Sequence, residues 1–376
     1  MSEGTCDRAF GAVREVFDAN LASGADLGAG LTVFVNGRCV VELWGGVADK
    51  RSDRAWDRAT ECVTFSCTKA VTATAALLLT ERGLVSLSDP VTSWWPEFGA
   101  HGKDTTTGEQ LLSHQAGLPA FDRPITPEQA SDPAAMAAQL AGQTPQWIPG
   151  TDHGYHAVTF GWLVGELVRR LSGMTVGEFV RGEFGPDLWI GVPASRLDAL
   201  ARISGGGPMH VDDLPGSPAL VAALISATQD PDSPTQRSMT NPAASFNNPV
   251  LLTGGWPAAG LIATSRALAD FYSRLVAGEI LAPDTLRDAL RQRVRGPDRT
   301  LITESAFGLG FMLPCSNMYL PLAARATAFG HPGASGALGL GDLDRGVAIG
   351  FIPNLSRPAL GDRRAFHLVE AVYSSL

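Results

Sequence analysis

Residues 63–82 read VTFSCTKAVTATAALLLTER and join a short extended segment to a long apolar helix. The first three residues are β-branched or aromatic, which is typical of a strand. Ala, Leu and Thr dominate from Lys69 to Arg82, which predicts a buried helix, and Gly83 is a suitable end for it. Ser66 therefore lies where a strand passes into a helix.

Ser66 and Lys69 form an S-x-x-K pattern at that transition. Residues three apart share one face of a helix, so the two side chains would lie side by side. The N–H of Ser66 would be an unpaired donor at the helix start, which suits a developing oxyanion. Burial and the positive helix end favour the neutral form of Lys69, which can accept the serine proton. The pattern thus indicates a nucleophile, Ser66, and its base, Lys69.

The alternative is a capping serine followed by a surface lysine. The helix after Lys69 is too apolar for a surface position, which disfavours that interpretation. Cys67 is adjacent to Ser66 on the helix and points another way, into apolar surroundings. We therefore expect Cys67 to be an inert buried thiol.

Strand patterns occur on both sides of this stretch, toward the two ends of the chain. Leu31–Val35 and Cys39–Leu43 flank Asn36-Gly37, which is a strong hairpin signal. Further patterns predict helices at 6–22, 264–275 and 365–374, and strands at 308–313, 326–330, 336–340 and 347–352.

The middle of the chain is different. Its patterns predict helices at 108–113, 133–141, 159–171 and 176–184, and long loops in the Gly-, Pro-, Ser- and Asn-rich stretch 204–249. The predicted fold class is α+β, with one antiparallel sheet built from both ends of the chain and flanked by helices. We expect one discontinuous domain over 1–85 and 251–376 and a mostly helical inserted domain over 86–250, with the binding site between them.

Two more segments could contribute chemistry. Tyr155 follows Pro149-Gly150 and is expected to open the 159–171 helix, where a phenol can relay a proton. Without Ser66 it would be interpreted as a core tyrosine. Residues 330–336 read GHPGASG, and their small side chains let a ligand approach the backbone closely, although a plain glycine-rich turn has the same composition.

Composition limits the functional class. The chain has 376 residues, 45% hydrophobic and 18% charged, with a net charge of −9, which predicts a folded protein with an acidic surface. Such a surface argues against nucleic acid and anionic membranes as partners. No segment resembles a membrane span or a signal peptide, and the five cysteines are odd in number and far apart, which favours reduced thiols and a cytoplasmic location. His153 and His156 are not joined by other ligands, so no metal or other cofactor is predicted; the oligomeric state stays open.

Three segments, taken in order, resemble one family: Ser66-Cys-Thr-Lys69, Tyr155, and His331-Pro-Gly333. The chain resembles the penicillin-binding-protein and serine β-lactamase superfamily, and most of all its class C-like esterases, the family VIII carboxylesterases. Residues 111–119, LLSHQAGLP, are similar to that family's LLSHTSGLP stretch. The resemblance extends from about residue 9 to residue 376.

The resemblance implies a role for each matching residue. Ser66 would attack an acyl carbon, and Lys69 and Tyr155 would share the proton transfers. The backbone N–H groups of Ser66 and Ala334 would form the oxyanion hole. His331 and Gly333 would bind substrate where lactamases carry Lys-Thr-Gly.

Two departures bear on the substrate. Lactamases have Tyr-x-Asn where this chain has Tyr155-His156-Ala157, and His331 replaces the lysine of Lys-Thr-Gly. Both changes remove groups that would bind a β-lactam. We therefore expect a carboxylesterase acting on small or short-acyl esters through an acyl-enzyme. The alternatives are a β-lactamase or D-amino-acid peptidase, an acyltransferase, and a catalytically silent scaffold of the same fold.

Overall fold

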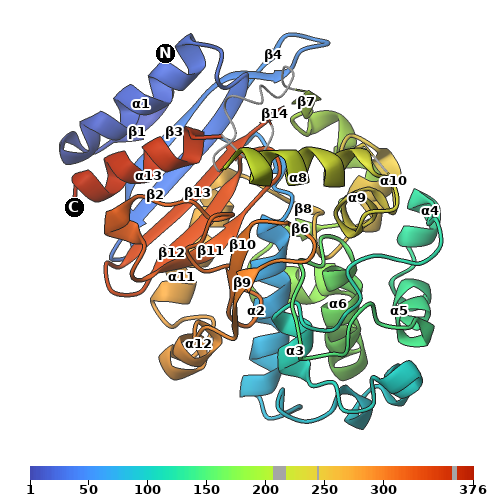
Figure 1. Cartoon of the computed structure of the whole chain (residues 1–376). Coiled ribbons are helices and arrows are strands. Elements are labelled where there is room, and N and C mark those ends of the chain that lie inside the picture. The colour runs from blue at the N-terminus through green and yellow to red at the C-terminus, as the bar shows by residue number, and fades with distance from the viewer. Residues whose placement is uncertain (206–216, 244, 358–361) are drawn as a thin grey trace.

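The computed structural model describes residues 1–205, 217–243, 245–357 and 362–376. A central antiparallel sheet contains strands from both ends of the chain, in the order β1-β3-β2-β13-β12-β11 (Figure 1). Val33 of β2 pairs with Ile349 of β13, so the two ends join in the middle of the sheet. The strands are β1 (Glu3–Cys6), β2 (Gly28–Val35), β3 (Arg38–Asp49), β11 (Ala328–Pro332), β12 (Leu338–Asp342) and β13 (Val347–Pro353), and the two-residue β4 (Arg54–Ala55) pairs with β3. The predicted fold class is confirmed.

The predicted hairpin is present between β2 and β3. Asn36 and Gly37 have φ angles of 50° and 74°, which is the left-handed conformation that a two-residue turn of this type requires. The predicted helix at 6–22 begins later, because Cys6 is the last residue of β1; a 3-10 turn (Arg8–Phe10) then leads into α1 (Gly11–Ala22).

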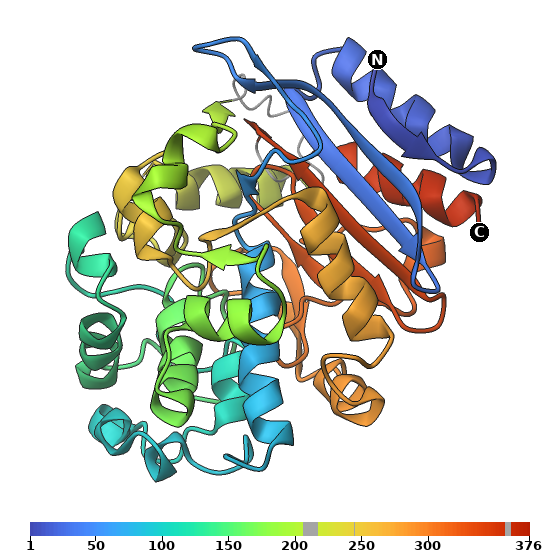
Figure 2. The same ribbon diagram turned by 180° about the vertical axis from the view of Figure 1, so that it is seen from behind.

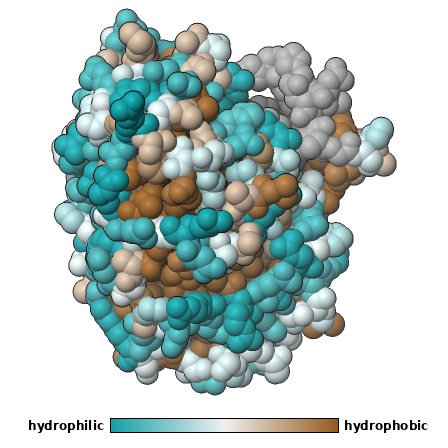
Figure 3. Space-filling view, turned by 90° about the vertical axis from the view of Figure 1, so that its left-hand side faces the viewer, coloured by the Kyte–Doolittle hydropathy of each residue, from teal (hydrophilic) through white to brown (hydrophobic). Residues whose placement is uncertain are grey.

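Helices cover both faces of the sheet. α1 and α13 (Arg364–Ser374) lie against one face, and α11 (Ser265–Val276) packs on the other (Figures 1 and 2). A side chain at Gly350 of β13 would collide with the carbonyl oxygen of Ser265, so the small residue lets α11 approach closely. On the side where α1 and α13 lie, apolar residues gather in bands and small groups between hydrophilic ones (Figure 3).

The helical part is built around α2 (Cys67–Glu81), which packs against α6 (Thr159–Ser172) and α7 (Val176–Glu183) and also reaches β11. The other helices of this part are α3 (Gly108–Leu112), α4 (Pro127–Ala130), α5 (Pro133–Gly142), α8 (Pro218–Gln229), α9 (Pro234–Thr240) and α10 (Pro249–Gly254), with 3-10 turns at Val91–Ser93, Pro96–Gly102 and Ala194–Ala199. The division into domains 1–85 with 251–376 and 86–250 stays a prediction. No helix in the described ranges has the length and apolar character needed to span a membrane.

Small sheets and turns complete the fold. β5 (Cys62–Val63) and β6 (Trp189–Ile190) flank β8 (Leu261–Ala263), and β7 (Ser204–Gly205) pairs with β14 (Leu355–Ser356). α12 (Pro283–Ala289), the hairpin of β9 (Val294–Pro297) and β10 (Glu304–Phe307), and a 3-10 turn (Leu322–Ala324) lie between α11 and β11 in sequence.

Two predicted segments have the wrong secondary structure. The stretch 204–249, which was predicted to form long loops, contains helices α8 and α9. Ser217 and Ser233 cap these helices, and each serine is followed by a proline, which is a signal for the start of a helix. The loop-like composition of the stretch hides this signal. Residues 206–216 and 244 of that stretch lie outside the described residues. The strand predicted at 308–313 is irregular, because Gly310 has a φ of 79° and lies directly against Ala73 of α2.

Candidate active site

Ser66 lies at the start of α2, where the chain turns sharply out of β5. Phe65 adopts a φ of 52°, which is uncommon for a residue with a side chain. The turn is held by the hydrogen bond from Thr64 N–H to the Leu261 carbonyl (2.8 Å). Ser66 makes no side-chain capping bond to the helix, so its hydroxyl is available to other partners.

Lys69 lies one helical turn from Ser66, as predicted, and its side chain is fully buried. Its Nζ lies 3.2 Å from Ser66 Oγ and donates to the carbonyl oxygens of Ala157 (2.6 Å) and Ala258 (3.0 Å). Burial lowers the pKa of the Lys69 ammonium well below its ordinary value. The structure therefore favours a neutral amine beside the serine.

Tyr155 reaches the same serine from the other side. Its O–H donates to Ser66 Oγ over 2.7 Å, and its ring lies 4.7 Å from Lys69 Nζ. Burial raises the pKa of the phenol above its ordinary value, so Tyr155 stays protonated at neutral pH. The prediction that Tyr155 opens a helix is wrong. Tyr155 lies in an irregular segment before α6, which begins at Thr159.

A neutral lysine can make these three contacts, as can an ammonium. An uncharged amine has two N–H donors and one lone pair, and Lys69 faces two carbonyl oxygens and one hydroxyl. Ser66 O–H can then donate to the Lys69 lone pair while its oxygen accepts from Tyr155. In this arrangement a proton can pass from Ser66 Oγ to Lys69 Nζ.

Ser66 and Ala334 line the same cavity. Among the described residues, the N–H groups of Ser66 and Ala334 have no hydrogen-bond acceptor. Gly333 N–H donates to Ala337 O (2.7 Å), which fixes the turn that carries Ala334. A side chain at Gly333 would collide with the Thr64 carbonyl, so the turn packs directly on the segment before Ser66.

The remaining predicted site residues contribute in unequal ways. Ala157 faces Lys69 with its backbone carbonyl, and its methyl group has no hydrogen-bonding capacity. His331 is 1% exposed and its Nδ1 donates to the Pro332 carbonyl (2.8 Å). Burial lowers the pKa of His331 to about 3, so this imidazole is neutral at physiological pH. Cys67 is fully buried, as predicted, and burial raises the pKa of its thiol to about 12.

Ser66 and Tyr155 line a cavity of about 220 Å³. Much of its wall is apolar, and it includes three methionines, Met239, Met312 and Met318. Tyr319 and Phe366 stack at 5.0 Å between ring centroids along another part of the wall. Sequence reasoning missed these residues, because they come from separate segments that only the fold brings together.

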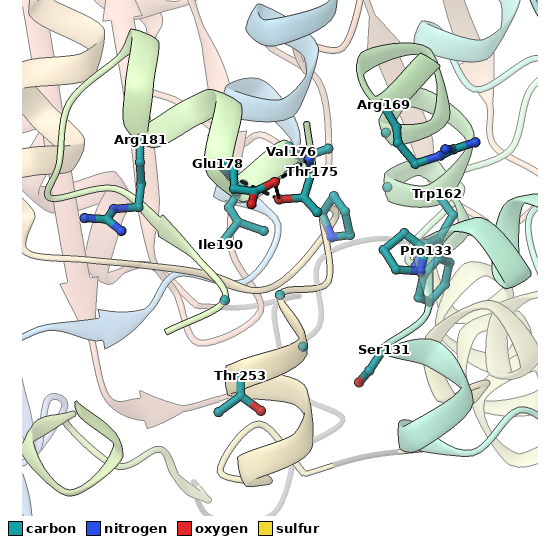
Figure 4. A pocket seen from close by; sticks show the side chains of 17 residues that line it. Ser131, Pro133, Trp162, Arg169, Thr175, Val176, Glu178, Arg181, Ile190 and Thr253 are labelled. Atoms are coloured by element: carbon teal, nitrogen blue, oxygen red, sulfur yellow. Dashed lines mark hydrogen bonds between the residues drawn. The ribbon is translucent and has the colours of Figure 1, made fainter. Parts of the chain in front are cut away.

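A larger cavity of about 470 Å³ lies elsewhere, between α6, α7 and α10 (Figure 4). Its lining includes none of Ser66, Lys69 and Tyr155. The three charged side chains around it already have partners. Arg169 is paired with Glu166, Glu178 caps α7 through Thr175, and Arg181 donates to the Pro186 carbonyl. The smaller cavity, which Ser66 and Tyr155 line, is therefore the candidate active site.

Comparison with known proteins identifies the family of the chain. The family model described as Beta-lactamase matches residues 13–373. The chain belongs to the beta-lactamase family. It is 33% identical to the esterase/beta-lactamase LipL of Mycobacterium tuberculosis, over 96% of this chain and 86% of that protein. The resemblance predicted from the sequence is thus confirmed.

Two solved structures match the entire chain. One is a family VIII carboxylesterase, with 30% identity, a TM-score of 0.88 and full coverage of both chains. The other is a penicillin-binding protein homologue from Caulobacter crescentus, with 34% identity, a TM-score of 0.88 and full coverage of both chains. The protein is an enzyme of the beta-lactamase-like hydrolase superfamily with esterase-named relatives.

Proposed function

We propose that the protein is a serine carboxylesterase that cleaves small or short-acyl esters through an acyl-enzyme on Ser66. One observation carries this proposal: Ser66 Oγ lies within hydrogen-bonding distance of both the buried Lys69 amine and the Tyr155 phenol. A small-molecule ester is the partner, and the chemistry requires no cofactor.

Acylation follows from the proposed roles. Ser66 Oγ attacks the acyl carbon while its proton passes to Lys69 Nζ, and the carbonyl oxygen gains negative charge. The N–H groups of Ser66 and Ala334 would stabilise that oxyanion. When the intermediate collapses, the bond to the alkoxide breaks, and the proton held by Lys69 reaches the alkoxide through Tyr155, whose own proton is replaced.

Deacylation reverses the proton path. The oxygen of a water molecule attacks the acyl carbon while one of its protons passes to the Tyr155–Lys69 pair. When the intermediate collapses, the bond between the acyl carbon and Ser66 Oγ breaks, the pair returns the proton to Oγ, and the carboxylic acid is released. An alcohol in place of water would give acyl transfer by the same steps. The relative named esterase/beta-lactamase makes β-lactam hydrolysis the second candidate function.

An organophosphonate should modify Ser66 covalently and abolish ester hydrolysis. Among the serines, Ser66 is the one that this proposal places beside both a base and two free N–H donors. Peptide mass mapping after inhibition identifies the modified residue. Modification of Ser113 or Ser335 instead would contradict the site assignment, and Ser66→Ala is the control that should remain unlabelled.

As the pH is raised, kcat/KM should increase and reach its plateau well below pH 10.5, the ordinary pKa of a lysine. Lys69 must be neutral, and burial lowers its pKa, so activity falls only as the pH drops through that lowered value. Tyr155 must be protonated, and burial raises its pKa, so no alkaline limb from the phenol is expected below pH 10.

The profile is measured with a short p-nitrophenyl ester, with spontaneous hydrolysis subtracted at each pH. Tyr155→Phe is the control, because it should lower the plateau and leave the acid limb. Activity that rises steadily up to pH 10.5 would show a Lys69 of ordinary pKa and contradict the base assignment.

A further inference from the structure

Three successive backbone N–H groups in the irregular segment around Tyr155 are held by two distant residues. Gly154 N–H donates to the carbonyl of His114 (3.1 Å), and His156 N–H donates to His114 Nδ1 (3.1 Å). Between them, Tyr155 N–H donates to Asp298 Oδ1 (2.9 Å). This segment has no helical or sheet ladder, so these bonds fix its backbone position.

Asp298 is a buried carboxylate, 2% exposed. Its Oδ1 also accepts from Thr300 N–H and Leu301 N–H, each at 2.8 Å, and its Oδ2 accepts from the Ser305 hydroxyl at 2.7 Å. Ser305 Oγ lies 3.1 Å from His153 Nε2. Asp298 takes part in no ion pair among the described residues, and the neighbouring Arg299 pairs with Asp152 instead. Its four hydrogen bonds compensate for the burial of the carboxylate.

We propose that Asp298 is a positioning residue for Tyr155. The inference rests on the proposed function, in which Tyr155 moves a proton to and from Ser66. The phenol makes a 2.7 Å hydrogen bond to Ser66 Oγ, and a displacement of about 1 Å takes such a bond out of hydrogen-bonding range. Misplacements of this size cost up to about a hundredfold in rate.

Asp342 provides a matched control. It is fully buried, and its Oδ1 accepts from Asp344 N–H and Arg345 N–H, each at 3.1 Å, in the same kind of turn as Asp298. Its Oδ2 accepts from the Tyr373 hydroxyl at 2.6 Å. Asp342 ends β12 at the end of the strand remote from the Pro332–Leu338 turn and makes no hydrogen bond to Tyr155.

The test compares serine substitutions at the two aspartates. A serine hydroxyl can cap the same local turn, but at position 298 it is too short to reach Tyr155 N–H. We expect Asp298→Ser to lower kcat for p-nitrophenyl acetate about thirtyfold with KM changed less than about threefold. Asp342→Ser should leave kcat within about threefold of the wild type. Asp298→Asn keeps an acceptor oxygen for Tyr155 and should restore kcat to within about fivefold.

A double-mutant cycle separates positioning from general destabilisation. In a Tyr155→Phe background, Asp298→Ser should lower kcat by no more than about threefold, because the phenol that it positions is absent. Equal losses in Asp298→Ser and Asp342→Ser, or a loss that persists in the Tyr155→Phe background, would overturn the inference. Thermal unfolding followed by circular dichroism verifies that each variant is folded.

Two outcomes distinguish the inference from the proposed function. If the wild type is active and Asp298→Ser has the same kcat, the inference about Asp298 is overturned and the proposed function stands. If the wild type has no esterase activity, the inference and the proposed function are both overturned. If Asp298→Ser does not fold, Ser305→Ala is the second variant, because it removes the hydroxyl that orients the carboxylate. It should lower kcat about fivefold, and again only when Tyr155 is present; unchanged kcat would overturn the inference.

Discussion

Lys69→Ala should lower kcat for short p-nitrophenyl esters by about a thousandfold or more, because the variant loses both the base and the activation of the nucleophile. The expectation rests on the position of Nζ, 3.2 Å from Ser66 Oγ in a site that burial keeps uncharged. Steady-state kinetics over a range of ester concentrations gives kcat and KM separately. KM should change much less than kcat, since Lys69 is fully buried and does not line the cavity.

Lys69→Arg is the matched variant for this prediction. An arginine retains the length and the hydrogen-bond donors but stays protonated, so it should not restore activity. Wild-type turnover in either variant would contradict the proposed mechanism. Lys103 provides the control, because it too is fully buried and donates to two carbonyl oxygens, those of Ala100 and Gln143, but does not line the cavity. Lys103→Ala should therefore lower the free energy of unfolding and leave kcat of the folded protein nearly unchanged.

The enzyme should hydrolyse acetate and butyrate esters readily, with kcat/KM for penicillins and cephalosporins at least about a hundredfold lower. A β-lactam carries an amide side chain and a carboxylate that need polar partners. Ala157 supplies no amide donor, and burial keeps His331 neutral by lowering its pKa to about 3. Each lost hydrogen bond costs about 1–3 kcal/mol, so two lost contacts are enough for this ratio.

The measurement compares p-nitrophenyl butyrate with nitrocefin on one preparation. Ser66→Ala should abolish both activities, which would show that the two substrates use one site. Comparable kcat/KM values, or a preference for nitrocefin, would mean that other groups replace the missing asparagine and lysine. The neutral state of His331 makes the prediction sharper than the sequence alone did, because an exposed histidine would be partly charged near neutral pH.

The sequence was sufficient to place Ser66 beside Lys69, because both lie within one helical turn. Residues three apart on a helix are close in any fold, so the Ser66–Lys69 contact needed no tertiary information. The Asn36-Gly37 hairpin was predictable for the same reason, since its turn geometry is local. Tyr155 was a candidate from its own sequence context, and the resemblance to a known family linked it to Ser66, which lies far from it in sequence.

Contacts that depend on tertiary structure were not predictable. The carbonyl of Ala258, which accepts from Lys69, belongs to a residue without any functional side chain. Asp298 lies in an unremarkable Pro-Asp turn, and nothing in its sequence context indicates that its carboxylate meets Tyr155. The missed helices α8 and α9 are a different case, because Ser-Pro start signals were present and the loop-like composition outweighed them.

The pairing of β2 with β13 has a consequence for synthesis on the ribosome. The hairpin of β2 and β3 leaves the ribosome early. One edge of β2 stays unpaired until β13, which lies about 310 residues later in the chain, has been translated. An unpaired strand edge in an incomplete chain is a template for aggregation, and sheets closed by such distant segments fold slowly. Nascent chains should therefore depend on chaperone protection, and hydrolytic activity should emerge only after the turn that carries Ala334 has left the exit tunnel.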